Sequence, residues 1–321
     1  MYKALITGIT GQDGTYLAEL LLSKGYQVIG TIRNARKYRE TRHLEMESEV
    51  ELVEWDMLSQ ERITALLSQY RPVEIYKLAA YSSGAGMYDD PISVGDVNGL
   101  AVTRILEAIR TVDSSIRFCQ ASSREIFGEA VESPQSENTA LKPRSPYGAA
   151  KMYADAMVRI YRQHYNIFAC SAILYNHESP LRGVEFVTRK VTRTAARIKL
   201  GLETELHIGN LDGERDWGYA GDYVRAMWLM LQQTNADDFV IATGESHSVQ
   251  QLCQIAFSHL GLDFERYVRL VDTAFRPSEV VRLVGCVEKA KEILGWIPGV
   301  NFRELVQMMV DEDMRRESAL L

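Results

Sequence analysis

Short apolar runs alternate with longer amphipathic stretches along the first half of the chain. Residues 3–7 (KALIT) form an apolar run typical of a buried strand, and residues 15–26 then place apolar side chains at helical spacing. Strands alternating with helices at this spacing indicate an α/β fold with a Rossmann-type, doubly wound parallel sheet. Further strands are predicted at 27–31, 51–53, 74–81, 116–123 and 168–176, and further helices at 63–70, 99–112 and 149–165.

Beyond Asn176 the alternation becomes irregular, which predicts a smaller mixed α/β part. The apolar run 237–243 is expected to return to the main sheet. Amphipathic helices are expected at 188–201, 248–261 and 301–317. The predicted domains are residues 1–176 with a return segment at about 210–243, and residues 177–209 together with 244–321.

Composition excludes several classes of protein. The 321 residues are 46% hydrophobic, and the net charge of −7 leaves no basic surplus for broad nucleic-acid binding. No apolar run reaches the roughly 18 residues of a membrane span, and no signal peptide precedes the first strand, so we expect a cytoplasmic protein. The cysteines form no CxxC pair and are interpreted as thiols in a reducing compartment, not as metal ligands; they are Cys119, Cys170, Cys253 and Cys286.

A glycine-rich turn joins the first strand to the first helix. Gly8, Gly11 and Gly14 have GxxGxxG spacing, and Gln12 and Asp13 lie between them. Glycines here allow a tight turn and a close approach of the backbone to a pyrophosphate, which then meets the positive end of the helix dipole. The strand–turn–helix context favours a dinucleotide site over a merely structural turn.

The residues after the second and third strands bear on which dinucleotide binds. An acidic residue after the second strand would favour NAD, whereas Arg33 and Arg36 suit a 2′-phosphate and favour NADP. The alternative is a solvated basic loop. Asp56, after the third strand, is expected to bond the adenine amino group.

A candidate catalytic pair begins the long helix that follows residue 145. Tyr147 and Lys151 are four residues apart and therefore share one helix face. An ammonium near the phenol is expected to lower the Tyr147 pKa from its usual value of about 10, so that the phenol takes a proton from a substrate hydroxyl as hydride leaves its carbon. Ser123 and Glu125 follow the fifth strand, at the edge where such sheets place active sites. Glu125 is a candidate base for a carbon-bound proton; the alternative is a loop carboxylate facing water.

These residues resemble the extended short-chain dehydrogenase/reductase superfamily, and more closely the GDP-mannose 4,6-dehydratase family, over nearly the whole chain. The segments NHESP, FVTRK and RDWG are far more specific than the dinucleotide motifs. The stretches that carry the resemblance are GITGQDGTYLAELLLSKGY, PRSPYGAAK, ILYNHESPLRG, EFVTRK, GNLDGERDWGYAGDYVRAMWLMLQQ and RPSEV.

The resemblance implies a redox-neutral dehydration of a GDP-hexose. Tyr147 would remove the C4 hydroxyl proton as hydride passes from C4 to NADP. Glu125 would take the acidified C5 proton, water would leave C6, and hydride would return to C6. Lys151 would hold the nicotinamide ribose and tune Tyr147, and Ser123, which stands where the family has Thr, would reach the C4 oxygen. NADP would be regenerated in each turnover and is expected to be tightly bound.

The resemblance also implies ligand contacts. Leu78 and Ala80 would contact the cofactor. Lysine and arginine neutralise a diphosphate, and glutamate accepts from ribose hydroxyls. The residues that would hold the GDP-sugar are Ser82, Asn176, Val187, Lys190, Arg215, Arg276 and Glu279.

The chain departs from the family pattern beside Glu125. Arg124 replaces a small residue there. An arginine stays charged, so it cannot donate the proton that an aspartate at this position supplies in related nucleotide-sugar dehydratases. Near Glu125 it would also weaken the carboxylate as a base. The alternative is that Arg124 points toward solvent or a subunit contact.

A second departure lies at residues 81–87 (YSSGAGM), which line the hexose pocket in the family. Ser83 and Gly84 replace larger apolar residues, whereas Tyr81 and Met87 add bulk. The resulting hypothesis is that the sugar differs from mannose or that the reaction stops at a different stage.

Three functions stay open on the sequence alone. The first is a GDP-hexose 4,6-dehydratase. The second is a GDP-sugar reductase or epimerase that uses Tyr147 and Lys151 without C6 elimination, and the third is a GDP-sugar/NADP-binding protein without turnover. A homodimer or homotetramer is expected, with residues 101–110 and the helix bearing Lys151 at the pairing face and residues 36–42 reaching a neighbour's cofactor.

Overall fold

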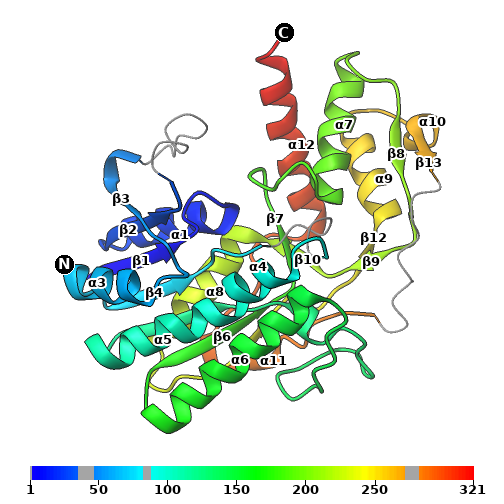
Figure 1. Ribbon diagram of the computed structural model, residues 1–321. Helices are drawn as coiled ribbons and strands as arrows, with labels where there is room; N and C mark the ends of the chain where they lie inside the picture. Colours follow the sequence, from blue (N-terminus) through cyan, green and yellow to red (C-terminus); the bar gives the residue numbers. More distant parts are fainter. Residues whose placement is uncertain (1, 35–46, 82–87, 272–281) are drawn as a thin grey trace.

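A parallel seven-stranded sheet forms the centre of the molecule, with the strand order β11-β6-β5-β4-β1-β2-β3 (Figure 1). The computed structural model describes residues 2–34, 47–81, 88–271 and 282–321. Because the order runs outward from β1 in both directions, the predicted Rossmann-type doubly wound sheet is confirmed. The strands are β1 (Lys3–Thr7), β2 (Gln27–Ile32), β3 (Val50–Glu54), β4 (Glu74–Lys77), β5 (Arg117–Ala121), β6 (Ala169–Leu174) and β11 (Phe239–Ile241).

Helices cover both faces of this sheet. Successive strand residues point to opposite faces, so Ile75 packs under one group of helices and Tyr76 under the other. The helices on the Ile75 face are α3 (Gln60–Tyr70), α5 (Ala101–Val112) and α6 (Pro146–Tyr165). The helices on the Tyr76 face are α1 (Gln12–Ser23), α8 (Ala220–Gln232) and α11 (Glu288–Leu294).

A separate apolar cluster holds together three helices at the upper right of Figure 1. They are α7 (Val187–Lys199), α9 (Val249–His259) and α12 (Phe302–Ser318), at the places that the periodicity predicts. Two-stranded sheets accompany them: β7 (Asn176–Glu178) with β10 (Trp217–Tyr219), β9 (Glu214–Arg215) with β12 (His247–Ser248), and β8 (Leu206–Ile208) with β13 (Val268–Leu270). The domain boundary at residue 176 stays a prediction.

Short helical segments occupy several of the connections. Two of them, α4 and η2, run directly into α5, and η3 follows β5. The segments are η1 (Glu47–Glu49), α4 (Pro91–Gly95), η2 (Asp96–Leu100), η3 (Arg124–Ile126) and α10 (Phe264–Tyr267). Within the described ranges, no helix is long and apolar enough to cross a membrane.

Candidate active site

The predicted catalytic pair lies in the first two turns of α6. Ser145 caps this helix by accepting a hydrogen bond from the Gly148 amide at 3.0 Å, and Pro146 occupies the first turn. Lys151 Nζ is 5.5 Å from the centre of the Tyr147 ring and donates to the Ala121 carbonyl at 2.6 Å. The helix start thus brings phenol and ammonium together at the end of β5.

Burial changes the acidity of both side chains. It raises the pKa of Tyr147 to about 12, a shift that a hydrogen bond with the Ser123 hydroxyl opposes. It lowers the pKa of Lys151 to about 8, a shift that the nearby Asp155 carboxylate opposes. The expectation that Lys151 lowers the Tyr147 pKa is wrong for this structure. The ammonium is turned toward the Ala121 carbonyl, and the loss of solvation around the phenol dominates.

Ser123 and Glu125 lie beside this pair because α6 packs closely against η3. A Cβ at Gly148 would stand 2.5 Å from the Glu125 carbonyl oxygen, so only glycine allows the approach. Ser123 caps η3, its hydroxyl accepting from the Glu125 amide at 3.2 Å. The predicted hydroxyl, phenol and carboxylate therefore converge at the carboxyl end of β5.

Arg124 turns inward beside Glu125. It is only 7% exposed, and its Nη2 lies 3.0 Å from Glu125 Oε1. The alternative in which Arg124 points toward solvent is therefore wrong. The guanidinium thus forms a charge-assisted ion pair with the Glu125 carboxylate.

The glycine turn has the close packing that its spacing predicts. Gly8 has a positive φ of 74°, and a Cβ there would stand 2.8 Å from the Ala79 backbone. A Cβ at Gly14 would stand 2.4 Å from the Gly8 carbonyl oxygen. Gly11 caps α1 without a side chain, so the positive end of the helix is open to a phosphate. The turn fits the pyrophosphate of a dinucleotide.

The side chains of Gln12 and Asp13 tie this turn to β7. Asp13 Oδ2 lies 2.9 Å from His177 Nε2, and the other ring nitrogen lies 2.7 Å from the Tyr175 carbonyl. Burial opposes both charges, yet the pair overcomes it: His177 holds the Asp13 pKa below its usual value, and Asp13 holds the His177 pKa above its own. Gln12 donates to the His177 carbonyl at 3.0 Å and accepts from Ser179 at 2.8 Å.

The residues predicted to contact the adenosine end of the cofactor, Arg33 and Asp56, are both exposed but bond different partners. Arg33 is exposed after β2 and donates to the Tyr81 hydroxyl at 3.2 Å. The Tyr81 ring lies 5.7 Å from that guanidinium, so Tyr81 reaches the end of β2. That Tyr81 adds bulk near the hexose stays a prediction. The exposed Asp56 accepts from the Leu58 amide at 2.9 Å, within its own loop.

Leu78 and Ala80 follow β4, where both are half-buried. The Leu78 amide donates to the Thr7 hydroxyl at 3.1 Å, which holds this segment against β1. Several predicted positions lie outside the described residues, namely Arg36, residues 37–42, Ser82, Ser83, Gly84, Met87, Arg276 and Glu279.

The predicted substrate residues that the structure describes lie in β7, β9 and α7. Asn176 carries a buried side-chain oxygen that has no hydrogen-bond partner among the described residues, which marks a place for a ligand donor. Val187 is the first residue of α7, and Lys190 donates to the His207 carbonyl at 2.6 Å. Arg215 lies in β9 and donates to the Glu214 carbonyl at 2.6 Å.

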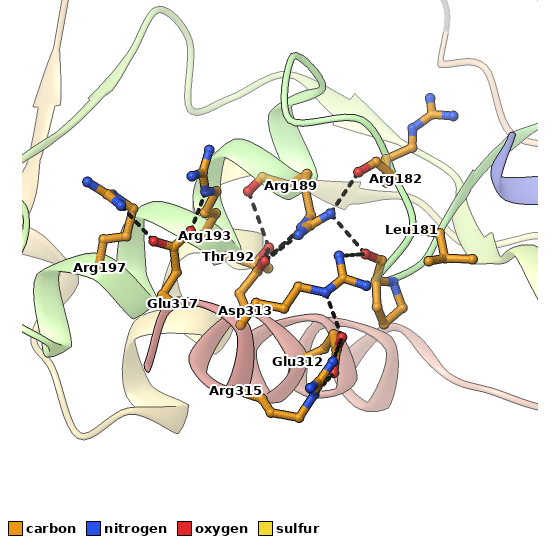
Figure 2. Close-up of polar contacts among 12 residues, drawn as sticks. Leu181, Arg182, Arg189, Thr192, Arg193, Arg197, Glu312, Asp313, Arg315 and Glu317 are labelled. Carbon is orange, nitrogen blue, oxygen red and sulfur yellow. Dashed lines mark hydrogen bonds and ion pairs between the residues drawn. The ribbon is translucent and has the colours of Figure 1, made fainter. Parts of the chain in front are cut away.

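An ion-pair network anchors α7 at this place (Figure 2). Arg189 pairs with Asp313 of α12 at 2.6 Å, and the Arg189 guanidinium also donates to the Pro180 and Arg182 carbonyls. Glu317 of α12 accepts from two further arginines of α7, Arg193 and Arg197. The network thereby holds the segment around residue 180 and the helix that begins with Val187 in one arrangement.

Sequence reasoning missed three buried polar residues near the site. His177 lies inside the quoted NHESP segment, and Asp155 lies one turn after Lys151 on α6. Lys77 stands inside the predicted strand 74–81 and is 0% exposed. A lysine between apolar and aromatic strand residues was the available signal. Among the described residues, no group of His, Cys, Asp and Glu side chains could hold a metal ion.

Known proteins resemble the chain over nearly its full length. The family model described as GDP-mannose 4,6 dehydratase matches residues 5–309. GDP-mannose 4,6 dehydratase 2 of Arabidopsis thaliana is 47% identical, covering 99% of this chain and 89% of the relative. The human GDP-mannose 4,6 dehydratase is 44% identical, covering 97% and 91%.

Solved structures share the fold. The UDP-glucose 4-epimerase of Thermotoga maritima, with UDP-glucose, has a TM-score of 0.85 at 25% identity and covers 99% of each chain. The dTDP-glucose 4,6-dehydratase of Bacillus anthracis, in complex with NAD, has a TM-score of 0.85 at 19% identity and covers 99% and 98%. RMD of Pseudomonas aeruginosa, complexed with NADPH, has a TM-score of 0.81 at 20% identity and covers 98% and 100%. With the sequence relatives and the matched family model, the conclusion is that this chain belongs to the GDP-mannose 4,6-dehydratase family.

Proposed function

We propose that the protein is a GDP-hexose 4,6-dehydratase, a lyase that converts GDP-mannose or a related GDP-sugar to a GDP-4-keto-6-deoxy sugar with NADP. The observation that carries the proposal is the convergence of Tyr147 with Lys151, Ser123 and Glu125 where β5 meets α6. The phenolate form of Tyr147 serves hydroxyl deprotonation, whereas the Glu125 carboxylate serves removal of a carbon-bound proton. A reductase or an epimerase at C4 needs only the first of these.

The residues divide the reaction between them. The bound nicotinamide supplies a hydride acceptor and donor. Tyr147 takes the C4 hydroxyl proton, and the resulting ketone makes the C5 hydrogen acidic enough for Glu125 to remove. Arg124 has no proton to give at neutral pH, so the proton held by Glu125 is the one available to the departing C6 hydroxyl. Hydride addition at C6 and protonation at C5, which is balanced by the proton that Tyr147 took from the C4 hydroxyl, complete a product that is one water lighter.

The cofactor and the nucleotide have separate sets of residues. The turn through Gly8, Gly11 and Gly14 would hold the pyrophosphate of NADP, Arg33 the 2′-phosphate, and Lys151 the nicotinamide ribose. Asn176, Val187, Lys190 and Arg215 would hold GDP together with Arg276 and Glu279. The free oxygen of Asn176 supports this assignment, because a buried polar atom without a partner is rare in native proteins.

We also infer a homodimer or homotetramer in the cytoplasm. Ile92 is 78% exposed on α4, and Leu100 on η2 is 43% exposed. Tyr153 and Ile160 on α6 add two further exposed side chains of the same kind. A second copy covering these helices would remove this apolar surface from water. Light scattering of the purified protein measures the number of copies.

Mass spectrometry after incubation with a panel of GDP-hexoses tests the activity. The expected product is one water lighter than its substrate, with no net change in NADPH absorbance. Glu125→Gln is expected to abolish the loss of water while leaving Tyr147 and Lys151 in place. A product of unchanged mass, or stoichiometric consumption of NADPH, would contradict the proposal. Rapid turnover of GDP-mannose would reject the hypothesis of an altered sugar.

A further inference from the structure

A second buried lysine lies beneath the site, and the proposed reaction does not use it. Lys77 ends β4 and is 0% exposed. Its Nζ donates to the Val97 carbonyl in η2 at 2.8 Å. Within the described part of the chain, no carboxylate forms an ion pair with it. An ammonium buried in this way lacks compensation for its lost hydration.

Lys77 faces the same side of the sheet as Lys151. The strand register pairs Lys77 with Gln120, and Gln120 with Ser171. Because Ile75 packs on the α6 face, the alternation of the strand directs Lys77 there too. Lys151 reaches the same place from α6, bonding the Ala121 carbonyl next to Gln120. The two amines lie within electrostatic range of each other.

Asp155 is the carboxylate of this cluster. It is 0% exposed and lies one turn after Lys151 on α6. Its two oxygens accept from the Ser171 hydroxyl at 2.8 Å and from the Ser122 hydroxyl at 2.5 Å. These donors stabilise the charged carboxylate, although burial raises its pKa to about 6.

The structure gives Lys77 few polar neighbours. The strand register places Thr7 of β1 and Gln120 of β5 beside it, and the Val97 carbonyl of η2 accepts from it. Lys151 of α6 is the charged group that acts on it. Of the two amines, Lys151 thus has Asp155 as a nearby carboxylate, whereas Lys77 has none in an ion pair among the described residues.

We propose that Lys77 is a positioning residue for the Tyr147–Lys151 pair: the cluster carries a single ammonium, on Lys151, and Lys77 is an uncharged amine that braces η2 against β4. Two ammonium groups would leave one buried positive charge unpaired. Lys151 keeps the proton because Asp155 lies one turn away on its own helix. Burial and the nearby Lys151 lower the Lys77 pKa well below its usual value, which agrees with this assignment.

The brace reaches the segment that follows β4. Asn98, next to Val97, donates to the Tyr81 carbonyl and accepts from the Tyr81 amide, both at 3.0 Å. Lys77 and Asn98 together tie η2 to both ends of the segment containing Leu78 and Ala80. In turn, η2 packs closely on α6 beside the pair, because a Cβ at Gly99 would stand 3.4 Å from the Ala150 carbonyl oxygen.

Nitrogen-15 NMR of the lysine side chains in the whole purified protein tests the charge assignment. One lysine is expected as a neutral amine at neutral pH, and its signal is expected to vanish in Lys77→Met. Lys291→Met is the matched control, because Lys291 is exposed on α11. A wild-type spectrum in which every lysine is an ammonium overturns the proposal, and this measurement needs no variant to fold.

The pH dependence of turnover tests the link to Lys151, and this part rests on the proposed function. Lys77→Arg, which places a permanent positive charge beside Lys151, is expected to move the alkaline limit of turnover downward by about one pH unit, the scale on which two charged sites affect each other. Lys77→Met removes an uncharged amine and is expected to leave that limit where it is. Lys291→Met is expected to leave it unchanged. A folded Lys77→Met variant, or Lys77→Gln in its place, whose alkaline limit moves upward overturns the proposal, because Lys77 would then carry a charge in the wild-type protein. If no GDP-hexose is dehydrated, the proposed function fails, whereas the NMR result still decides the charge on Lys77.

Discussion

Buried charged side chains gather in two regions, around Arg189 between α7 and α12 and around Lys151 under the edge of the sheet. In the first, the Arg189 guanidinium makes ion-pair hydrogen bonds to both Asp313 oxygens and donates to two carbonyls (Figure 2). Thr192 donates to the same carboxylate at 2.7 Å. Each charge here has an opposite partner, so the network fixes one arrangement.

The Lys151 region is built differently. Lys151 has Asp155 as a nearby carboxylate, whereas Lys77 has none in an ion pair among the described residues, and each amine donates to a single backbone carbonyl. The pKa of Asp155 is raised to about 6 and that of Lys151 is lowered to about 8, so both groups gain or lose their proton close to neutral pH. A network in which every buried charge has an opposite partner stabilises the structure. A cluster in which one buried amine has no carboxylate partner has shifted pKa values, which suit proton exchange.

Tyr147→Phe should produce the largest effect. It should lower turnover without lowering stability, which would distinguish the Lys151 region from the Arg189 network. Loss of the phenol removes the group that takes the substrate proton, so turnover of a GDP-hexose should fall by about 10²–10⁴-fold. The free energy of unfolding should change by no more than about 1 kcal/mol. Tyr153→Phe, an exposed tyrosine on the same helix, is the control. Equal losses of turnover in the two variants would show that the Tyr147 phenol has no special role.

Asp313→Asn should act on stability. It leaves the buried Arg189 without its counter-charge, so the free energy of unfolding in urea should fall by about 3–5 kcal/mol. The pH limits of turnover should stay where they are. Glu312→Gln next to it loses ion pairs with Arg315, which is 68% exposed, and with Arg316, and should cost about 1 kcal/mol. Similar costs for the two variants would show that burial does not govern this network.

Asp155→Asn should reveal the cost of the unbalanced cluster. Burial raises the Asp155 pKa to about 6 from the usual 3.8, so the folded state holds a proton that the unfolded chain has lost. Stability from this group is therefore present at low pH and is lost as the pH rises from about 4 to 6. Asparagine does not ionise. The unfolding free energy of the variant, compared with wild type, should rise by up to about 3 kcal/mol across that range. A constant difference would contradict this picture.

Tyr81→Phe should give the smallest effect, because its partner is exposed. The change removes the hydroxyl that accepts from Arg33, worth about 0.5–1.5 kcal/mol at most. Binding of NADPH should weaken roughly two- to five-fold in calorimetry, and binding of NADH should not change. Tyr88→Phe, an exposed tyrosine elsewhere, is the control. A matching loss for NADH would mean that Tyr81 does not act through Arg33.

Local patterns determined much of what was predicted. The apolar run at Lys3–Thr7 is β1 with the same bounds, and Ser145 with Pro146 places the start of α6. Turns, helix caps and the spacing of residues on a helix face depend on residues close together in the chain. The glycine turn and the proximity of Tyr147 to Lys151 could therefore be predicted from the sequence. The carboxyl end of β5 followed from the alternation of strands and helices.

Tertiary structure alone decided which partners the polar residues take. Asp13 and His177 are separated by 164 residues in the chain, and Tyr81 and Arg33 by 48. No local pattern encodes such contacts, because they depend on how the sheet orders its strands. Arg124 was read with two orientations open, and packing of α6 against η3 turned it toward Glu125. In the sequence, Lys77 is only a lysine among the residues of the predicted strand 74–81. Lys77 is buried near Lys151 because β4 pairs with β5 in this register and because η2 covers its side chain and accepts its hydrogen bond.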